Sequence, residues 1–159
     1  MVVGTQMANN PITVLHVDDD PSFLNLTEEF LEREDSRFAI ETAPSADDGL
    51  DRIGDQPPDC VVSDYDMPGR NGIEFLQSAR EEYPDIPFIL FTGKGSESVA
   101  SEAISAGVTD YLQKKSGAEQ YELLANRITN AVEARRAARN ATRQKELMRL
   151  TELTGNTGG

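Results

Sequence analysis

Short apolar runs alternate with amphipathic helical stretches along the chain, and this alternation limits the possible folds more than any other feature. The run ITVLHV is rich in β-branched residues and too short for a helix. The next stretch, PSFLNLTEEFLERE, places Phe23, Leu26, Phe30 and Leu31 on one helical stripe. This pair of patterns occurs five times. The predicted strands are residues 12–17, 38–43, 60–64, 87–92 and 110–113, and the predicted helices are residues 21–34, 45–55, 72–83, 96–107 and 118–153.

Such an alternation predicts an α/β fold, in which helices cover both faces of a parallel sheet through right-handed crossovers. In these folds ligands bind beyond the carboxyl ends of the strands. Polar side chains stand at four of the predicted strand ends there: Asp18, Asp19 and Asp20 after the first strand, Asp64 and Thr92 as the last residues of the third and fourth, and Lys114 just past the fifth. The sequence therefore predicts one site that gathers them.

Carboxylates gathered at one edge repel each other, since two unit charges about 4 Å apart cost about 4 kcal/mol at an effective dielectric constant near 20. Either protons are taken up or a cation binds, and Mg²⁺ with oxygen ligands fits best. Lys114 and Thr92 could hold a phosphate oxygen by charge and by hydrogen bond. The set suits phosphoryl transfer, in which positioning and charge neutralisation do most of the catalysis.

The stretch VVSDYDMPGRNG allows two other interpretations. A calcium loop starting at Asp64 would need oxygen ligands where the chain has Pro68 and Phe75. A phosphatase of the haloacid-dehalogenase type would use DYDM, with Asp64 as nucleophile and Asp66 as acid or base. That family opens its sheet with this strand and carries a cap insertion, whereas here the acidic cluster comes first and the insertion is missing.

Four segments, VLHVDDD, VVSDYDMPGRNG, FTG and DYLQKK, together resemble the receiver domain of two-component response regulators over residues 11–117. The resemblance implies a flavodoxin-like, doubly wound (βα)5 fold with a five-stranded parallel sheet in the order 2-1-3-4-5. It also implies a phosphoacceptor switch that catalyses only its own phosphorylation and dephosphorylation. An inactive, receiver-like interaction module remains an alternative.

By this resemblance, Asp64 accepts a phosphoryl group from a sensor histidine kinase, and Thr92 and Lys114 contact that group. Mg²⁺, for which Mn²⁺ can substitute, would be bound by Asp18, Asp19, Asp64 and the backbone carbonyl of Asp66. Thr92 and Tyr111 would relay the change to the face formed by the fourth helix, fifth strand and fifth helix. Asp66 and Lys94 occupy positions that tune loss of the phosphoryl group.

Two positions depart from the family pattern. Lys115 stands where the family has a proline joined by a cis bond, and a non-proline cis bond costs roughly 2.5 to 4 kcal/mol. We expect either a strained cis bond or a trans bond with a reshaped loop, and favour the trans bond. Gly93 follows the switch hydroxyl, where the family favours alanine or another small residue, and should loosen that loop.

Several residues near the motifs have simpler interpretations. Asp20 can cap the helix that starts at Pro21 or touch the metal. His16 is expected to be a packed histidine and Cys60 a buried, unreactive thiol. Gly69 and Gly72 are expected to serve the backbone turn.

The charge is uneven: residues 1–117 carry a net charge of −15 and residues 118–159 a net charge of +2. An acidic body repels nucleic acid and anionic lipid, so we expect neither as its partner. The acidic, lysine-poor composition resembles that of proteins from high-salt cytoplasms, although a solvated acidic face explains it equally well.

The chain divides into a flexible N-terminus (1–10), a receiver domain (11–117), a fifth helix with its extension (118–153) and a flexible tail (154–159). Beyond Glu133 the helix exceeds what one such domain can bury, so we expect it to pair in a homodimer or to lead to an output domain; the output target is unknown. A frayed, solvated extension is the other interpretation. Without a membrane-length apolar run or a signal peptide, the expected location is cytoplasmic.

Overall fold

The computed structural model describes residues 10–93 and 95–158, with side chains described as far as Leu153. Lys94 and most of the predicted N-terminal segment therefore lie outside the described residues. The strands are β1 (Ile12–Val17), β2 (Phe38–Ala43), β3 (Cys60–Ser63), β4 (Phe88–Thr92) and β5 (Asp110–Gln113). The helices are α2 (Pro21–Glu34), α3 (Ala46–Asp55), α4 (Gly72–Glu82), α5 (Glu97–Ser105) and α6 (Glu119–Gly158).

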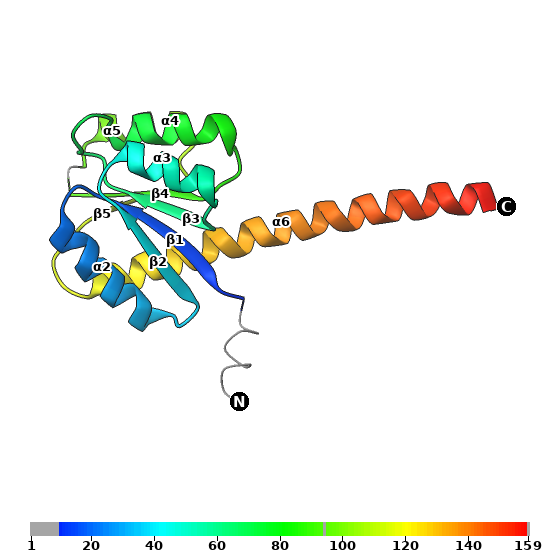
Figure 1. The fold of residues 1–159 in the computed structure, drawn as a ribbon, viewed down its shortest axis with the longest axis horizontal. Helices are drawn as coiled ribbons and strands as arrows, with labels where there is room; N and C mark the ends of the chain where they lie inside the picture. The colour runs from blue at the N-terminus through cyan, green and yellow to red at the C-terminus, as the bar shows by residue number, and fades with distance from the viewer. Residues whose placement is uncertain (1–9, 94, 159) are drawn as a thin grey trace.

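The five strands form one parallel sheet in the order β2-β1-β3-β4-β5, as predicted. Helices α3, α4 and α5 lie on one face, and α2 and the first half of α6 lie on the other (Figure 1). Successive residues of a strand point to opposite faces. Leu15 accordingly belongs to the apolar core under α3 and α4, and its neighbour Val14 belongs to the core under α2 and α6.

Side-chain caps start four of the helices at the residues where the sequence changes from strand to helix pattern. Asp20 caps α2, because its carboxylate accepts hydrogen bonds from the backbone N–H groups of Ser22 and Phe23. Ser45 caps α3, and Ser96 caps α5. Asn71 and Glu74 form a reciprocal capping box at α4.

Helix α6 is 40 residues long, and only its first part packs on the sheet. Tyr121, Leu124, Ile128 and Val132 are buried against the core, and beyond them the helix projects far from the body (Figure 1). At the exit, the guanidinium of Arg136 donates to the carbonyl of Pro11 at 2.9 Å and pairs with Asp59 at 3.3 Å. The helix continues as far as Gly158, through residues for which the sequence predicts a tail.

Within the described part of the chain, no helix combines the length and the apolar character that crossing a membrane requires.

Candidate functional site

Three parallel strands deliver the site residues just beyond their carboxyl ends. The sheet hydrogen bonding continues one residue past each strand. The N–H of Asp18 donates to the carbonyl of Ala43 at 3.1 Å, and the N–H of Asp64 donates to the carbonyl of Val17 at 3.0 Å. The N–H of Lys114 donates to the carbonyl of Thr92 at 2.9 Å. Backbone pairing therefore fixes where these side chains start.

The carboxylates of Asp18, Asp19 and Asp64 converge, with one oxygen from each lying within 4.8 Å of the others. Asp18 and Asp64 are buried, and Asp19 is exposed. Because hard oxygen donors at this spacing match the ligands of Mg²⁺, the residues present fit such an ion.

Lys114 lies against these acids. Its ammonium nitrogen Nζ is 2.7 Å from Asp18 Oδ2 and 3.6 Å from Asp64 Oδ1. Asp18 is the better paired of the two, since its Oδ1 also accepts the backbone N–H of Asp20 at 3.0 Å. Lys114 therefore offsets part of the repulsion within the acidic cluster.

The pKa of Asp64 lies above the ordinary value for an aspartate, because burial disfavours its charged form. The Lys114 charge, a hydrogen bond from Thr92 and the backbone N–H of Tyr65, 2.9 Å from Asp64 Oδ1, act in the opposite direction, and the charge of Asp18 adds to the rise. Positive charge in the pocket therefore favours the ionised form of Asp64.

These groups line a shallow, open pocket of about 390 Å³. Its lining residues are Asp18, Asp19, Asp20, Asp64, Asp66, Thr92, Gly93 and Lys114. Residues from all four sequence motifs therefore meet in one place. Tyr111, which belongs to the last motif, is not among the lining residues.

A family model for the response regulator receiver domain matches residues 14–126. The chain belongs to this family. The phosphatase and calcium-loop interpretations of residues 61–72 are thereby not favoured, and the predicted family is confirmed.

Known regulators resemble this receiver domain along most of its length. The photosynthetic apparatus regulatory protein RegA of Cereibacter sphaeroides is 33% identical over 108 residues, which cover 68% of this chain and 58% of RegA. Response regulator MprA of a Mycobacterium strain is 35% identical over 117 residues, which cover 72% of this chain and 48% of MprA. The chain thus spans about half the length of these two relatives.

Solved structures give the same picture. A receiver domain protein from Clostridium thermocellum superposes with a TM-score of 0.72 at 26% identity, covering 80% of this chain and 98% of that one. NtrX from Brucella abortus superposes with a TM-score of 0.73 at 27% identity, covering 84% of this chain but 29% of NtrX. The similarity in NtrX therefore involves one part of a longer protein.

Gly72 explains how this receiver domain holds its β3–α4 loop. The N–H of Gly72 donates to the carbonyl of Tyr65 at 2.8 Å, and a Cβ at Gly72 would lie 2.2 Å from the carbonyl oxygen of Asp64. Gly69 has φ of 82°, a conformation that favours glycine. Both glycines therefore serve the turn, as the sequence predicts.

The remaining sequence expectations are met in part. Asp20 is confirmed as a helix cap, although it also lines the pocket. His16 is fully buried, and burial lowers its pKa to about 4, as fits a packed, neutral histidine. Cys60 is fully buried, and burial raises the pKa of its thiol. The described residues contain no cis peptide bond, so Lys114 and Lys115 are joined in trans, the form that the sequence analysis favours.

Tyr111 does not line the acidic pocket. It is half-buried at β5 beside the loop after β4, where a Cβ at Gly95 would come within 2.9 Å of its hydroxyl oxygen. That hydroxyl is buried and has no hydrogen-bond partner among the described residues. Its role as a switch, like the metal role of the Asp66 carbonyl, stays a prediction.

Sequence reasoning missed Phe23 as a neighbour of the site. The helical stripe places Phe23 on the buried face of α2, but the structure also places its ring 4.1 Å below the ammonium of Lys114. The available signal was its position, one helical turn after the Asp18–Asp20 run.

Proposed function

We propose that Asp64 is the phosphoacceptor of this receiver domain and that a sensor histidine kinase is the donor. A carboxylate oxygen of Asp64 attacks the phosphorus of the phosphohistidine, the N–P bond breaks, and its electron pair returns to the imidazole. An acyl phosphate forms on Asp64. The observation that carries the proposal is the convergence of Asp64 with two other acids and Lys114 in one open pocket.

The neighbouring residues supply the positioning that this transfer needs. Lys114 is near enough to Asp64 to pair with a phosphoryl oxygen, and Thr92 already shares a hydrogen bond with the Asp64 carboxylate. Asp18, Asp19 and Asp64 would hold Mg²⁺, or Mn²⁺ in its place, with the Asp66 carbonyl as a further ligand. Bound there, the ion supplies charge neutralisation and orientation of the phosphoryl oxygens.

Phosphorylation adds about −1.5 to −2 charges to a pocket that is already acidic. Moving the Thr92 hydroxyl toward the new oxygens offsets part of that charge, and Tyr111 follows into the space that Thr92 leaves. The altered surface is the face formed by α5, β5 and α6. A target protein, or an output domain that α6 leads to, would bind this altered face. Asp66 and Lys94 would tune the lifetime of the phosphorylated state.

The extension of α6 supports a second part of the proposal, a homodimer paired through this helix. Four large apolar side chains project from it, each more than half exposed: Leu147, Met148, Leu150 and Leu153. Because helices in proteins are stabilised mainly by packing of an apolar face, a projecting helix of this kind gains stability from a second copy.

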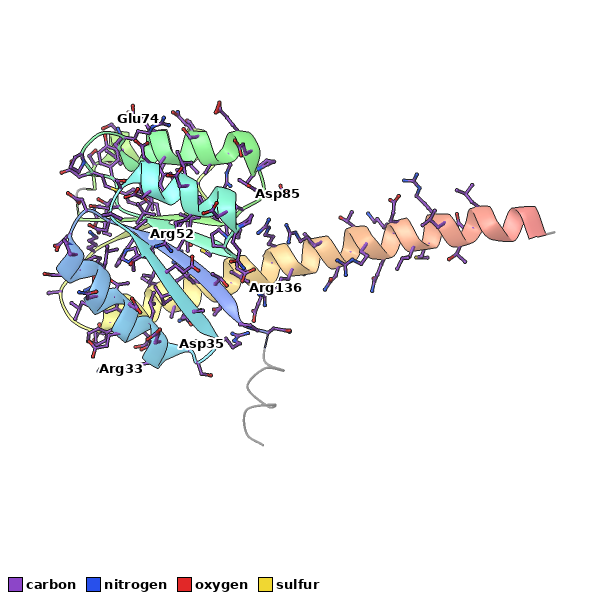
Figure 2. All side chains as sticks on the ribbon, viewed as in Figure 1. Arg33, Asp35, Arg52, Glu74, Asp85 and Arg136 are labelled. Atoms are coloured by element: carbon purple, nitrogen blue, oxygen red, sulfur yellow. The ribbon has the colours of Figure 1, made fainter. Side chains whose placement is uncertain are left out.

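Intact-mass measurement after treatment with acetyl phosphate and Mg²⁺ tests the assignment of Asp64. We expect the wild type to gain the mass of one phosphoryl group and Asp64→Asn to gain none. Asp85→Asn is the matched control, because Asp85 lies at the other end of the body (Figure 2), and it should behave as wild type.

Two outcomes would contradict the proposal. An unchanged wild-type mass would favour an inactive interaction module. Steady release of phosphate from small phosphate esters, without accumulation of the acyl phosphate, would favour an aspartyl phosphatase.

A further inference from the structure

We propose that Phe23 is a positioning residue for Lys114, which it holds in the phosphorylation pocket through a cation–π contact. The Lys114 ammonium lies 4.1 Å from the centroid of the Phe23 ring, while it pairs with Asp18 at 2.7 Å and with Asp64 at 3.6 Å. Cations within about 6 Å of an aromatic centroid are attracted by the negative face of the ring. The inference rests on the proposed function, because Lys114 matters there as the ligand of the phosphoryl group.

The ring of Phe23 is held by aromatic neighbours from three other elements. Its centroid lies 5.9 Å from that of His16 on β1, 5.8 Å from that of Phe91 on β4 and 6.3 Å from that of Tyr121 on α6. The backbone N–H of Phe23 also donates to the capping carboxylate of Asp20 at 3.3 Å. Phe23 therefore offers Lys114 a fixed surface.

Lysine needs such a surface here because its four-carbon stem is flexible, and because its compact ammonium lacks the fixed donor directions of an arginine guanidinium. The pocket offers the ammonium several carboxylates, including those of Asp20 and Asp66 on its rim. The ring attracts the ammonium toward the inner wall, beside Asp18 and Asp64, without using a hydrogen-bond acceptor. One N–H of Lys114 is donated to Asp18, and the contact with the ring leaves the other two for an incoming phosphoryl oxygen.

The contact itself can be tested without phosphorylation. The chain has four lysines, so reductive ¹³C-methylation gives few signals, and Lys114→Arg assigns the one of interest. We expect the Lys114 methyl signal to be shifted upfield by the ring current of Phe23. Phe23→Leu should abolish this shift and Phe23→Tyr should keep it. A Lys114 signal that is unshifted in the wild type, or the same in Phe23→Leu, would overturn the proposal.

Its effect on the reaction can be tested with fluorinated phenylalanine at position 23. One, two or three ring fluorines weaken the negative face of the ring progressively while its shape changes little. We expect the rate of phosphorylation by acetyl phosphate, followed by intact mass, to fall stepwise to about two- to fivefold below wild type. The same series at Phe75, which lies in the core on the opposite face of the sheet, should leave the rate unchanged.

The two measurements separate the possible failures. Equal rates across the series at position 23 would overturn the positioning role. If the wild type accepts no phosphoryl group, the proposed function fails, and the methyl-lysine spectra alone then decide whether Phe23 holds Lys114.

Discussion

At residue 72 the fold leaves no room for a side chain. A Cβ there would lie 2.2 Å from the carbonyl oxygen of Asp64 and 2.8 Å from Leu90 Cδ1, so α4 or the Asp64 backbone must move. We expect Gly72→Ala to lower the free energy of unfolding by about 1–3 kcal/mol and to slow phosphorylation of Asp64. Urea unfolding and intact mass measure the two effects.

Gly54→Ala is the control for the loss of glycine itself. Gly54 lies within α3, and nothing lies within 4 Å of a Cβ at that position. Because glycine disfavours a helix, the free energy of unfolding of this variant should rise by about 0.5–1 kcal/mol. Equal stability of the two variants would contradict the steric argument.

Asp35 provides a pH-dependent contribution to stability. Hydrogen bonds from Arg37, at 2.8 Å from Nη2 and 3.1 Å from Nε, hold the pKa of the Asp35 carboxyl below its ordinary value of 3.8. A carboxyl whose pKa is lowered by folding stabilises the protein above its unfolded pKa, and this contribution is lost as the pH falls through the folded pKa. Asp35→Asn should therefore lower the free energy of unfolding by about 1 kcal/mol at pH 7 and by far less at acid pH.

Urea unfolding of Asp35→Asn and wild type between neutral pH and about pH 3 checks this expectation. Glu29→Gln is the comparison variant, since Glu29 pairs with Arg33 across an exposed helical surface, where such pairs contribute little. A difference between Asp35→Asn and wild type that does not change with pH would refute the role of the carboxylate charge.

The sequence predicted Asp18, Asp19, Asp64, Thr92 and Lys114 correctly as neighbours because the ends of parallel strands share one edge. Contacts that depend on side-chain direction could not be predicted in this way. The helical stripe indicates that Phe23 is buried, but the contact of its ring with Lys114 depends on how α2 packs across β1. The same holds for Tyr111, whose partners are set by the loop after β4.

At the scale of the element, Asp20 at the start of α2 is a candidate for two roles, a helix cap and a metal ligand. Its carboxylate accepts two backbone N–H groups at the helix N-terminus and also reaches the rim of the pocket. We expect Asp20→Ala to lower the free energy of unfolding by about 1 kcal/mol, and Asp20→Asn, which can still cap, to change it little. Calorimetric titration with Mg²⁺ should show nearly unchanged binding to Asp20→Asn.

Asp19→Asn is the positive control for metal binding. Asp19 shares the cluster with Asp18 and Asp64 but caps no helix among the described residues. It should weaken Mg²⁺ binding strongly. If Asp20→Asn weakens Mg²⁺ binding as much as Asp19→Asn does, Asp20 is a ligand and not only a cap.

The helix and strand pattern could be read from the sequence because caps and apolar periods agree at each boundary. Ser45, for example, stands three residues before Asp48, and its hydroxyl accepts the backbone N–H of Asp48 at 3.2 Å. The direction in which α6 leaves the body could not be read in this way. It depends on contacts between Arg136 and the start of β1, more than a hundred residues away in the chain.

At the scale of the whole molecule, charge separates the body from the α6 extension. Residues 134–145 carry five basic side chains and no acidic one, whereas the chain as a whole has a net charge of −13. Arg136 uses this charge where the helix leaves the body (Figure 2), by pairing with Asp59 and the Pro11 carbonyl. The start of the extension is thus fixed to the sheet.

The proposed homodimer makes a geometric prediction about the end of this helix. If two copies of α6 run in parallel around a two-fold axis, equivalent apolar positions face each other. Leu147→Cys should then form an intermolecular disulfide on mild oxidation. Lys145→Cys, about 200° away around the helix, should not. The native Cys60 is fully buried, so it should not compete.

Light scattering after size exclusion checks the assembly itself, with and without acetyl phosphate. We expect a dimer for the wild type and a monomer for the double substitution of Leu147→Glu and Met148→Glu. That double variant should still accept a phosphoryl group at the wild-type rate, because both residues belong to the C-terminal part of α6, which projects away from the body (Figure 1). A wild-type monomer under both conditions, or equal cross-linking at positions 145 and 147, would exclude parallel pairing through this face and leave Asp64 phosphorylation unaffected.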